Sequence, residues 1–114
     1  MSMNYNKINI TDNNLLQRVK NVVTELEPDA DVYLFGSRAR GDINNESDWD
    51  FLVLLPGIID YERKRKILDA LFEVELSSGE IFNDIVKSKE FWKENNLLHA
   101  SPFYKNVTSE SIAL

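Results

Sequence analysis

The sequence contains no cysteine and a single histidine, His99, among its 114 residues. It can therefore form neither a disulfide framework nor a multi-histidine metal site, and any metal would have to be bound by oxygen ligands. No apolar stretch approaches the roughly 20 residues of a transmembrane helix, and the N-terminal residues lack the basic start and apolar run of a signal peptide. The sequence thus predicts a cytoplasmic protein without a membrane partner.

Positive charge is also scarce, because 13 lysines and arginines stand against 19 acidic residues and leave a formal net charge of -6. Proteins that coat duplex nucleic acid need clustered cations to neutralise the phosphate backbone. Duplex nucleic acid is therefore not expected as a partner. A nucleotide is still compatible with this charge, since a metal and one or two arginines can hold it locally.

The length and the hydrophobic content of 43% suit one hydrophobic core. We expect a single domain over residues 1–114, in which residues 1–10 and 101–114 form loose arms or, at the C-terminal end, a last helix. Helical spacing of apolar residues predicts helices near residues 15–26 and 58–76. Apolar runs predict a strand at residues 31–35 and a second that carries Asp48 and Asp50 and continues through residues 51–55, and weak alternation predicts a third at residues 81–86. The first two strands read as nearly continuous apolar runs, which is typical of strands covered on both faces.

Two carboxylates stand at the start of the second predicted strand. Asp48 and Asp50 are two residues apart, so they point to the same face while Trp49 points to the other. Two close carboxylates repel each other unless a cation lies between them. Mg²⁺ suits this arrangement, because it takes one or two carboxylates together with waters and the phosphate oxygens of a substrate. The pair therefore predicts a metal that arrives with a nucleotide.

A glycine-serine turn follows the first predicted strand. Gly36 lets the backbone approach a ligand closely, and Ser37 adds a hydroxyl group beside exposed backbone N–H groups. Such a turn can hold phosphate. Ser47, directly before the carboxylate pair, is a further candidate for nucleotide binding, with simple loop hydrogen bonding as the alternative.

The same turn carries two arginines, Arg38 and Arg40, that can make charge-assisted contacts to phosphate oxygens. Two residues apart on a helical turn, they cannot both point the same way. We therefore expect one of them to bind the nucleotide, and the sequence does not decide which. The alternative for both is surface ion pairing with Asp42 or Glu46.

These features together resemble a known signature. The run Phe-Gly-Ser at residues 35–37, a ten-residue spacer and the run Asp-Trp-Asp-Phe at residues 48–51 are similar to the motif of the DNA polymerase beta nucleotidyltransferase superfamily. The GSRARG run and the small size resemble its minimal nucleotidyltransferase (MNT) group, whose members often act as antitoxins beside a HEPN-domain partner. The resemblance implies an α+β fold, with a small mixed β-sheet and helices packed on one face. It also implies Mg²⁺, as two ions, and transfer of a nucleoside monophosphate, such as AMP from ATP, to an acceptor with release of pyrophosphate.

Enzymes of this superfamily usually need a third carboxylate on a neighbouring strand. Asp84 on the third predicted strand is the best candidate for this catalytic and metal-binding role, and we expect it to face the same cleft as the carboxylate pair. Its neighbours on that face would be apolar, so a surface carboxylate without a catalytic role is the alternative. Glu73 and Glu75 are fallback candidates. Without a third carboxylate the protein would bind nucleotide and metal but catalyse slowly or not at all.

The leading hypothesis is a Mg²⁺-dependent nucleotidyltransferase that modifies a protein partner, because the chain is too short to carry its own acceptor-binding domain. On this hypothesis the protein is the antitoxin of a HEPN-type toxin, and a homodimer is left open. One alternative is a nucleotide-binding antitoxin that acts by occlusion with a vestigial site. The other is a small-molecule nucleotidyltransferase of the aminoglycoside-modifying kind, with a separate acceptor-binding subunit.

Overall fold

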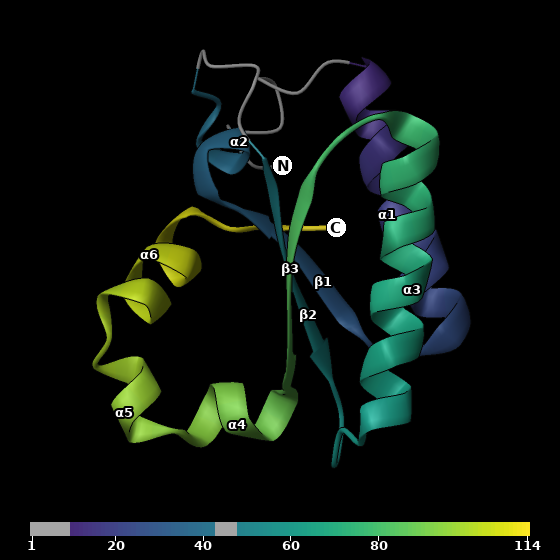
Figure 1. Cartoon of the computed structure of the whole chain (residues 1–114). Helices are drawn as coiled ribbons and strands as arrows, with labels where there is room; N and C mark the ends of the chain where they lie inside the picture. The colour runs from purple at the N-terminus through teal and green to yellow at the C-terminus, as the bar shows by residue number, and fades with distance from the viewer. Residues whose placement is uncertain (1–9, 43–47) are drawn as a thin grey trace.

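The computed structural model describes residues 10–42 and 48–114 (Figure 1). The elements in chain order are α1 (Ile10–Leu26), β1 (Asp31–Phe35), α2 (Gly36–Arg40), β2 (Trp49–Leu55), α3 (Tyr61–Ser78), β3 (Phe82–Ser88), α4 (Lys89–Glu94), α5 (Asn96–His99), α6 (Pro102–Glu110) and β4 (Ile112–Ala113). The three strands predicted from the sequence are present, and β4 is an addition to them. None of the described helices has the length and apolar content that crossing a bilayer requires.

The strands form one mixed sheet in the order β3-β2-β1-β4. β1 pairs antiparallel with β2 and with β4, whereas β3 pairs parallel with β2. Parallel pairing needs a crossover connection, which α3 supplies. The two strands predicted from apolar runs are the central ones, and residues 51–55 of β2 are all buried, as expected for a strand covered on both faces. The predicted α+β class with a mixed sheet is confirmed.

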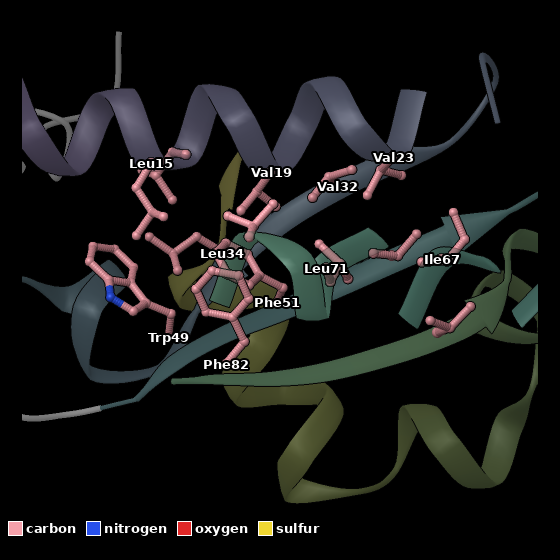
Figure 2. Packing of buried hydrophobic residues seen from close by; sticks show 14 of the residues in the cluster. Leu15, Val19, Val23, Val32, Leu34, Trp49, Phe51, Ile67, Leu71 and Phe82 are labelled. Atoms are coloured by element: carbon pink, nitrogen blue, oxygen red, sulfur yellow. The ribbon is translucent and has the colours of Figure 1, made fainter. Parts of the chain in front are cut away.

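The two long helices, α1 and α3, lie side by side on one face of the sheet (Figure 1). Their apolar stripes meet alternate strand residues in one buried cluster (Figure 2). The cluster contains Leu15, Val19 and Val23 of α1, Val32 and Leu34 of β1, Trp49 and Phe51 of β2, Ile67 and Leu71 of α3, and Phe82 of β3. Each such side chain contributes about 1.5–3 kcal/mol on burial, so this core face fixes the strands on which the polar residues stand.

The short helices α4, α5 and α6 lie on the opposite side of the sheet (Figure 1). A second, smaller apolar cluster forms there from Tyr33, Phe35, Leu52, Leu54, Ile85, Trp92 and Val107. The prediction that helices pack on one face therefore holds for the two long helices only. The short helices contribute few apolar residues, Trp92 and Val107 among them, so their sequences carry little of the periodicity that predicts a packed helix.

The C-terminal segment is part of the fold rather than a loose arm. The Ser101 side chain accepts the Tyr104 N–H, and Pro102 occupies the first turn of α6. Ile112 of β4 is buried, and the Leu114 N–H donates to the Val32 carbonyl at 2.9 Å. This end of the chain therefore completes the sheet beside β1. The other predicted arm, up to residue 9, lies outside the described residues.

Candidate active site

Three polar side chains meet where β2 and β3 begin. Asp48 immediately precedes β2, Asp50 lies within it, and Asn83 is the register partner of Asp50 on β3. The Asn83 Nδ2 group donates to Asp48 Oδ2 at 3.2 Å and to Asp50 Oδ1 at 3.0 Å. Both carboxylates therefore converge on a single nitrogen, and the structure places Asp48 and Asp50 side by side as the sequence predicts.

Gly36 lies against this pair. β1 and β2 pair so that Phe35 is opposite Asp50, which brings the next residue, Gly36, next to the Asp50 carboxylate. A Cβ atom at Gly36 would lie 2.1 Å from Asp50 Oδ2, and the backbone φ of Gly36 is +76°. Any other residue would therefore suffer both a clash and left-handed backbone strain. The close approach that the structure shows at Gly36 is to the Asp50 carboxylate, and the predicted approach to a ligand stays a prediction.

Ser37 follows Gly36 in the first turn of α2, a helix of five residues that ends at Gly41. Its side chain is half-buried and belongs to the same turn that approaches Asp50. The position is compatible with the predicted phosphate contact. Ser47, the other predicted serine, lies outside the described residues.

Arg38 points away from the carboxylate pair. Its guanidinium carbon lies 4.4 Å from the centre of the Trp49 ring, and Nη2 lies 4.0 Å from Glu80 Oε2. Trp49 belongs to the core face of the sheet, so Arg38 is on the side of α1 and α3. Its side chain is only 12% exposed. These contacts give Arg38 a packing role.

Arg40 takes the opposite direction. Its guanidinium group donates to Asp42 Oδ2 at 3.1 Å and to Glu110 Oε2 at 2.6 Å. Glu110 belongs to α6, which covers the side of the sheet that carries Asp50. Arg40 is thus the arginine on the site's side, and its ion pair with Asp42 is the surface pairing considered as the alternative. The other alternative partner, Glu46, lies outside the described residues.

Asp84 does not join the pair, and its expected place in the same cleft is wrong. It is the register partner of Phe51 on the core face, one residue out of phase with Asn83. Because strand side chains alternate, a shift of one residue moves a side chain to the other side of the sheet. Burial, and secondarily the charge of Glu75, raises the pKa of Asp84 to about 7. Its Oδ1 atom is buried and has no hydrogen-bond partner among the described residues.

The fallback carboxylates also lie elsewhere. Glu75 Oε2 accepts the backbone N–H of Phe82 at 3.1 Å from its position on α3. Glu73 is an exposed residue of the same helix. Since α3 covers the core face, neither residue replaces the missing third carboxylate. The described residues contain no group of three acidic or histidine side chains placed to hold one metal ion.

Asn83 is therefore the third member of the site, and it is not among the site residues predicted from the sequence. The sequence contains a signal for the position of Asn83. Trp49 and Phe82 are large apolar side chains at the start of two paired strands, so both are expected on the core face. Their neighbours Asp50 and Asn83 then share the other face. Predicting this needed the β2–β3 register, which the sequence does not supply directly.

The pair fits a hard divalent cation. Two carboxylate oxygens converge on one point, where the amide of Asn83 now provides the positive end of a dipole. Mg²⁺ needs only one or two protein carboxylates when phosphate oxygens and waters complete its shell. Asp48 and Asp50 would be the residues that hold such an ion.

Comparison with known proteins decides the family. The nucleotidyltransferase domain family matches residues 16–110 of this chain. The chain belongs to that family. It is therefore a nucleotidyltransferase by descent, which agrees with the carboxylate pair and glycine turn. Over 83 residues it is 36% identical to MJ0604 of Methanocaldococcus jannaschii, which is provisionally named a protein adenylyltransferase; the match covers 73% of this chain and 75% of that protein.

A solved structure shares the fold. The crystal structure of a toxin-antitoxin with AMP-PNP superposes with a TM-score of 0.57 at 15% sequence identity. The match covers 85% of this chain and 69% of that chain. At this level of identity the likeness concerns the fold alone. A polymerase-beta-like nucleotidyltransferase fold is thus consistent with both the sequence family and the arrangement of the sheet.

Proposed function

We propose that the protein is a Mg²⁺-dependent nucleotidyltransferase that moves AMP from ATP to a hydroxyl group of a partner polypeptide. The observation that carries this proposal is the convergence of Asp48 and Asp50 beside the Gly36 turn. The name of the archaeal relative supports an adenylyl group and a protein acceptor.

The chain's own residues have separable roles in this reaction. Gly36 lets the turn approach the Asp50 carboxylate, Ser37 donates to a phosphate group held beside it, and Arg40 exchanges a carboxylate partner for phosphate oxygens. Bound Mg²⁺ would stabilise the negative charge of the phosphate groups during the transfer. The acceptor oxygen forms a bond to the α-phosphorus, the bond from that phosphorus to the bridging oxygen breaks, and pyrophosphate leaves with the electron pair. The acceptor proton passes to a carboxylate of the pair.

The test incubates the protein with Mg²⁺, ATP and a co-purified partner, and follows the partner by intact mass spectrometry. The partner should gain one or more AMP groups, and Asp48→Ala or Asp50→Ala should abolish that gain. Asp29→Ala, which removes an exposed carboxylate outside the site, is the matched control and should retain activity. A partner that stays unmodified with every nucleoside triphosphate tried would refute the enzymatic proposal.

One observation favours a second candidate function. Asn83 occupies the place where a third carboxylate would complete the site, and its amide is neutral. This suits an antitoxin that binds nucleotide and metal but neutralises its toxin by occlusion. The two functions differ in the Asp48→Ala, Asp50→Ala double variant, which should still protect cells from the toxin if occlusion suffices.

Asn83→Asp distinguishes the same two functions by adding a carboxylate to the site instead of removing one. A third carboxylate should raise the affinity for Mg²⁺ and, in an enzyme limited by metal binding, should increase AMP transfer about tenfold or more. Metal affinity is measured by calorimetry and transfer by incorporation of labelled ATP. A variant that binds Mg²⁺ more tightly without gaining transfer would favour occlusion.

The proposed partner is a toxin of the HEPN type, encoded with this protein. Support comes from the shared fold with the antitoxin-containing structure and from the MNT-like GSRARG run. Co-expression should relieve the growth arrest that the toxin causes alone. AMP transfer to an aminoglycoside instead of a polypeptide would identify the small-molecule alternative.

A further inference from the structure

One edge of the sheet has no neighbouring strand among the described residues. β3 is the outermost strand, and within residues 10–42 and 48–114 no strand pairs with its other side. Figure 1 looks toward this edge, with α3 on one side of β3 and α4 on the other. An open strand of seven residues presents unpaired N–H and C=O groups that favour pairing with a further strand.

The backbone groups that point outward can be assigned. The Ile81 carbonyl accepts the Trp49 N–H, so odd-numbered residues of β3 bond inward to β2. The Phe82 N–H points the other way, where the Glu75 carboxylate binds it. Asp84 and Val86 follow in the same phase, and they therefore offer the free hydrogen-bonding groups at the centre of the edge.

The side of α3 that overhangs this edge is apolar in the middle and charged at its ends. Glu75 reaches the edge at Phe82, and helical spacing puts Lys64, Leu68 and Phe72 on the same side of α3. Phe72 is 54% exposed. The order along the helix is thus basic, apolar, apolar and acidic, and in an antiparallel pair it is complementary to itself.

This pattern fits a second copy of the same chain related by a twofold axis. In an antiparallel arrangement Lys64 of one copy lies opposite Glu75 of the other, and Leu68 lies opposite Phe72. Helices pack about 8–10 Å apart and strands about 4.8 Å apart, so one helix covers roughly two strands. The helices α1 and α3 already cover the four strands of one copy. The next helix on this face would therefore lie above the strands of the second copy, and this helix would be the α3 of that copy.

A hollow of about 580 Å³ lies at the end of β3 and extends the surface that a second copy would contact. Ile58, Ile59, Val86 and Phe91 line it, together with Lys64 and Lys87. Ile58 is 91% exposed. On the twofold arrangement, the exposed Ile81 of the second copy lies beyond the end of β3, next to Ser88, which also lines this hollow.

We propose that two copies of this chain pair antiparallel through β3, so that Lys87 of each copy lies at the carboxylate pair of the other. With Asp84 opposite Val86 of the second copy, the axis passes through Ile85 and Lys87 falls directly opposite Asn83. Directly opposed side chains share a face and have Cβ atoms about 4.5–5.5 Å apart. Asn83 already contacts Asp48 and Asp50, so the lysine of the second copy reaches the same site.

This lysine adds a second cation to the side of the sheet on which Arg40 lies. Arg38 is directed to the core face, and Arg40 is shared with two carboxylates. Within one chain the Lys87 ammonium group lies 5.5 Å from the centre of the Phe91 ring. In the dimer it would leave this ring and bind the phosphates of the triphosphate as a point charge beside the metal site. This role rests on the proposed function, whereas the dimer itself does not.

The dimer is tested by sedimentation velocity over a range of protein concentrations. The unmodified protein should sediment as a dimer, and Phe72→Lys should weaken the dimer at least a hundredfold. Leu97→Lys changes a side chain that is 86% exposed on α5 and serves as the matched control, which should remain dimeric. A monomeric unmodified protein, or a Phe72→Lys variant that still dimerises, overturns the proposal. These readouts need no enzymatic activity, so they stand even if AMP transfer is never observed.

The lysine is tested by mixing two inactive variants. Lys87→Ala should weaken binding of a fluorescent ATP analogue about tenfold to a hundredfold while leaving the dimer intact. At an ATP concentration well below saturation, Asp50→Ala should be inactive alone and Lys87→Ala nearly so. Their mixture should regain about a quarter of the activity per chain, because half of the dimers then hold one intact site. An inactive mixture that still exchanges subunits, or unchanged ATP-analogue binding by Lys87→Ala, overturns the role of Lys87.

Discussion

At the scale of single residues, the site depends on a glycine with left-handed backbone geometry and on which residue of β3 faces the carboxylate pair. Gly36 has a positive φ and leaves space that the Asp50 carboxylate fills. Asn83 holds both carboxylates through one nitrogen. Asp84, its neighbour in sequence, lies on the other face with a raised pKa. A shift of one residue along the chain thus separates a site residue from a partly buried carboxyl group on the other face of the sheet.

Gly36→Ala should disable the site through its contact with Asp50. Gly79→Ala is the matched control, because Gly79 has the same φ of +76° and nothing within 4 Å of the added Cβ atom. Both variants should lose about 1–2 kcal/mol of unfolding free energy from left-handed strain. Only Gly36→Ala should also lose Mg²⁺ and nucleotide binding, measured by calorimetry. Equal binding by the two variants would show that the Gly36–Asp50 contact is unimportant.

Asp84 should make the protein less stable as the pH rises. Its pKa is about 7 in the folded state and 3.8 in the reference state, so the folded state holds the proton more tightly. The unfolding free energy should therefore fall between about pH 4 and pH 7 and then stay level. Asp84→Asn should reduce this slope and stabilise the protein at pH 8 by about 1–2 kcal/mol, a figure lowered for partial exposure. Urea unfolding across this pH range measures both effects.

The same variant tests the position of Asp84 relative to the site. Because the side chain lies on the core face, Asp84→Asn should keep nucleotide binding within about twofold of the unmodified protein. A loss as large as that of Asp50→Ala would contradict the observed register of β3.

At the scale of elements, the short helix α2 sends its two arginines to opposite sides of the sheet. Successive helical residues are rotated by about 100°, so side chains two apart diverge. Arg38 then stacks on Trp49 at the core face, while Arg40 meets Glu110 on the other side. Arg38 therefore packs against the core, whereas Arg40 lies on the side of the sheet that carries the candidate site.

Arg38→Gln and Arg40→Gln should therefore differ in kind. Arg38→Gln removes a mostly buried cation over Trp49 and should lower the unfolding free energy by about 1–2 kcal/mol with little effect on nucleotide affinity. Arg40→Gln should weaken binding of an ATP analogue about tenfold and change stability little, since its ion pairs are exposed. Denaturation and fluorescence titration of both variants would check this, and a reversed pattern would assign the phosphate contact to Arg38.

At the scale of the whole molecule, the sheet separates a large core from the candidate site. The long helices bury one face, and the shorter C-terminal helices border the other (Figure 1). β4 closes the sheet beside β1, far along the chain from the strands that carry the carboxylates. The C-terminal residues thus stabilise β1 and, through it, the turn that contains Gly36.

Ile112→Ala should show that the C-terminal strand belongs to the core. Ile112 is 4% exposed and packs in the main cluster, so the truncation should lower the unfolding free energy by about 2–4 kcal/mol. Ala113→Ser, at the neighbouring exposed position, is the control and should change it by less than about 0.5 kcal/mol. Urea denaturation gives both values. An unaffected Ile112→Ala protein would mean that β4 detaches in solution.

The sequence by itself determined the local chemistry of this protein. The Asp-x-Asp spacing places Asp48 and Asp50 on one face of any strand, and the apolar runs of β1 and β2 require burial on both sides. Helical periodicity and turn residues located the two long helices close to their observed bounds. These features depend on contacts between residues close in the chain, which is why they can be read directly.

Only the tertiary structure decided which distant residues complete the site. The parallel register of β2 and β3 brings Asn83 to the carboxylate pair and turns Asp84 to the core. Likewise, the packing of α6 assigns Arg40 to the site's side, and the pairing of β4 orders the C-terminal segment. Register and face are set by the fit of whole elements in a common core, and a shift of one residue reverses them.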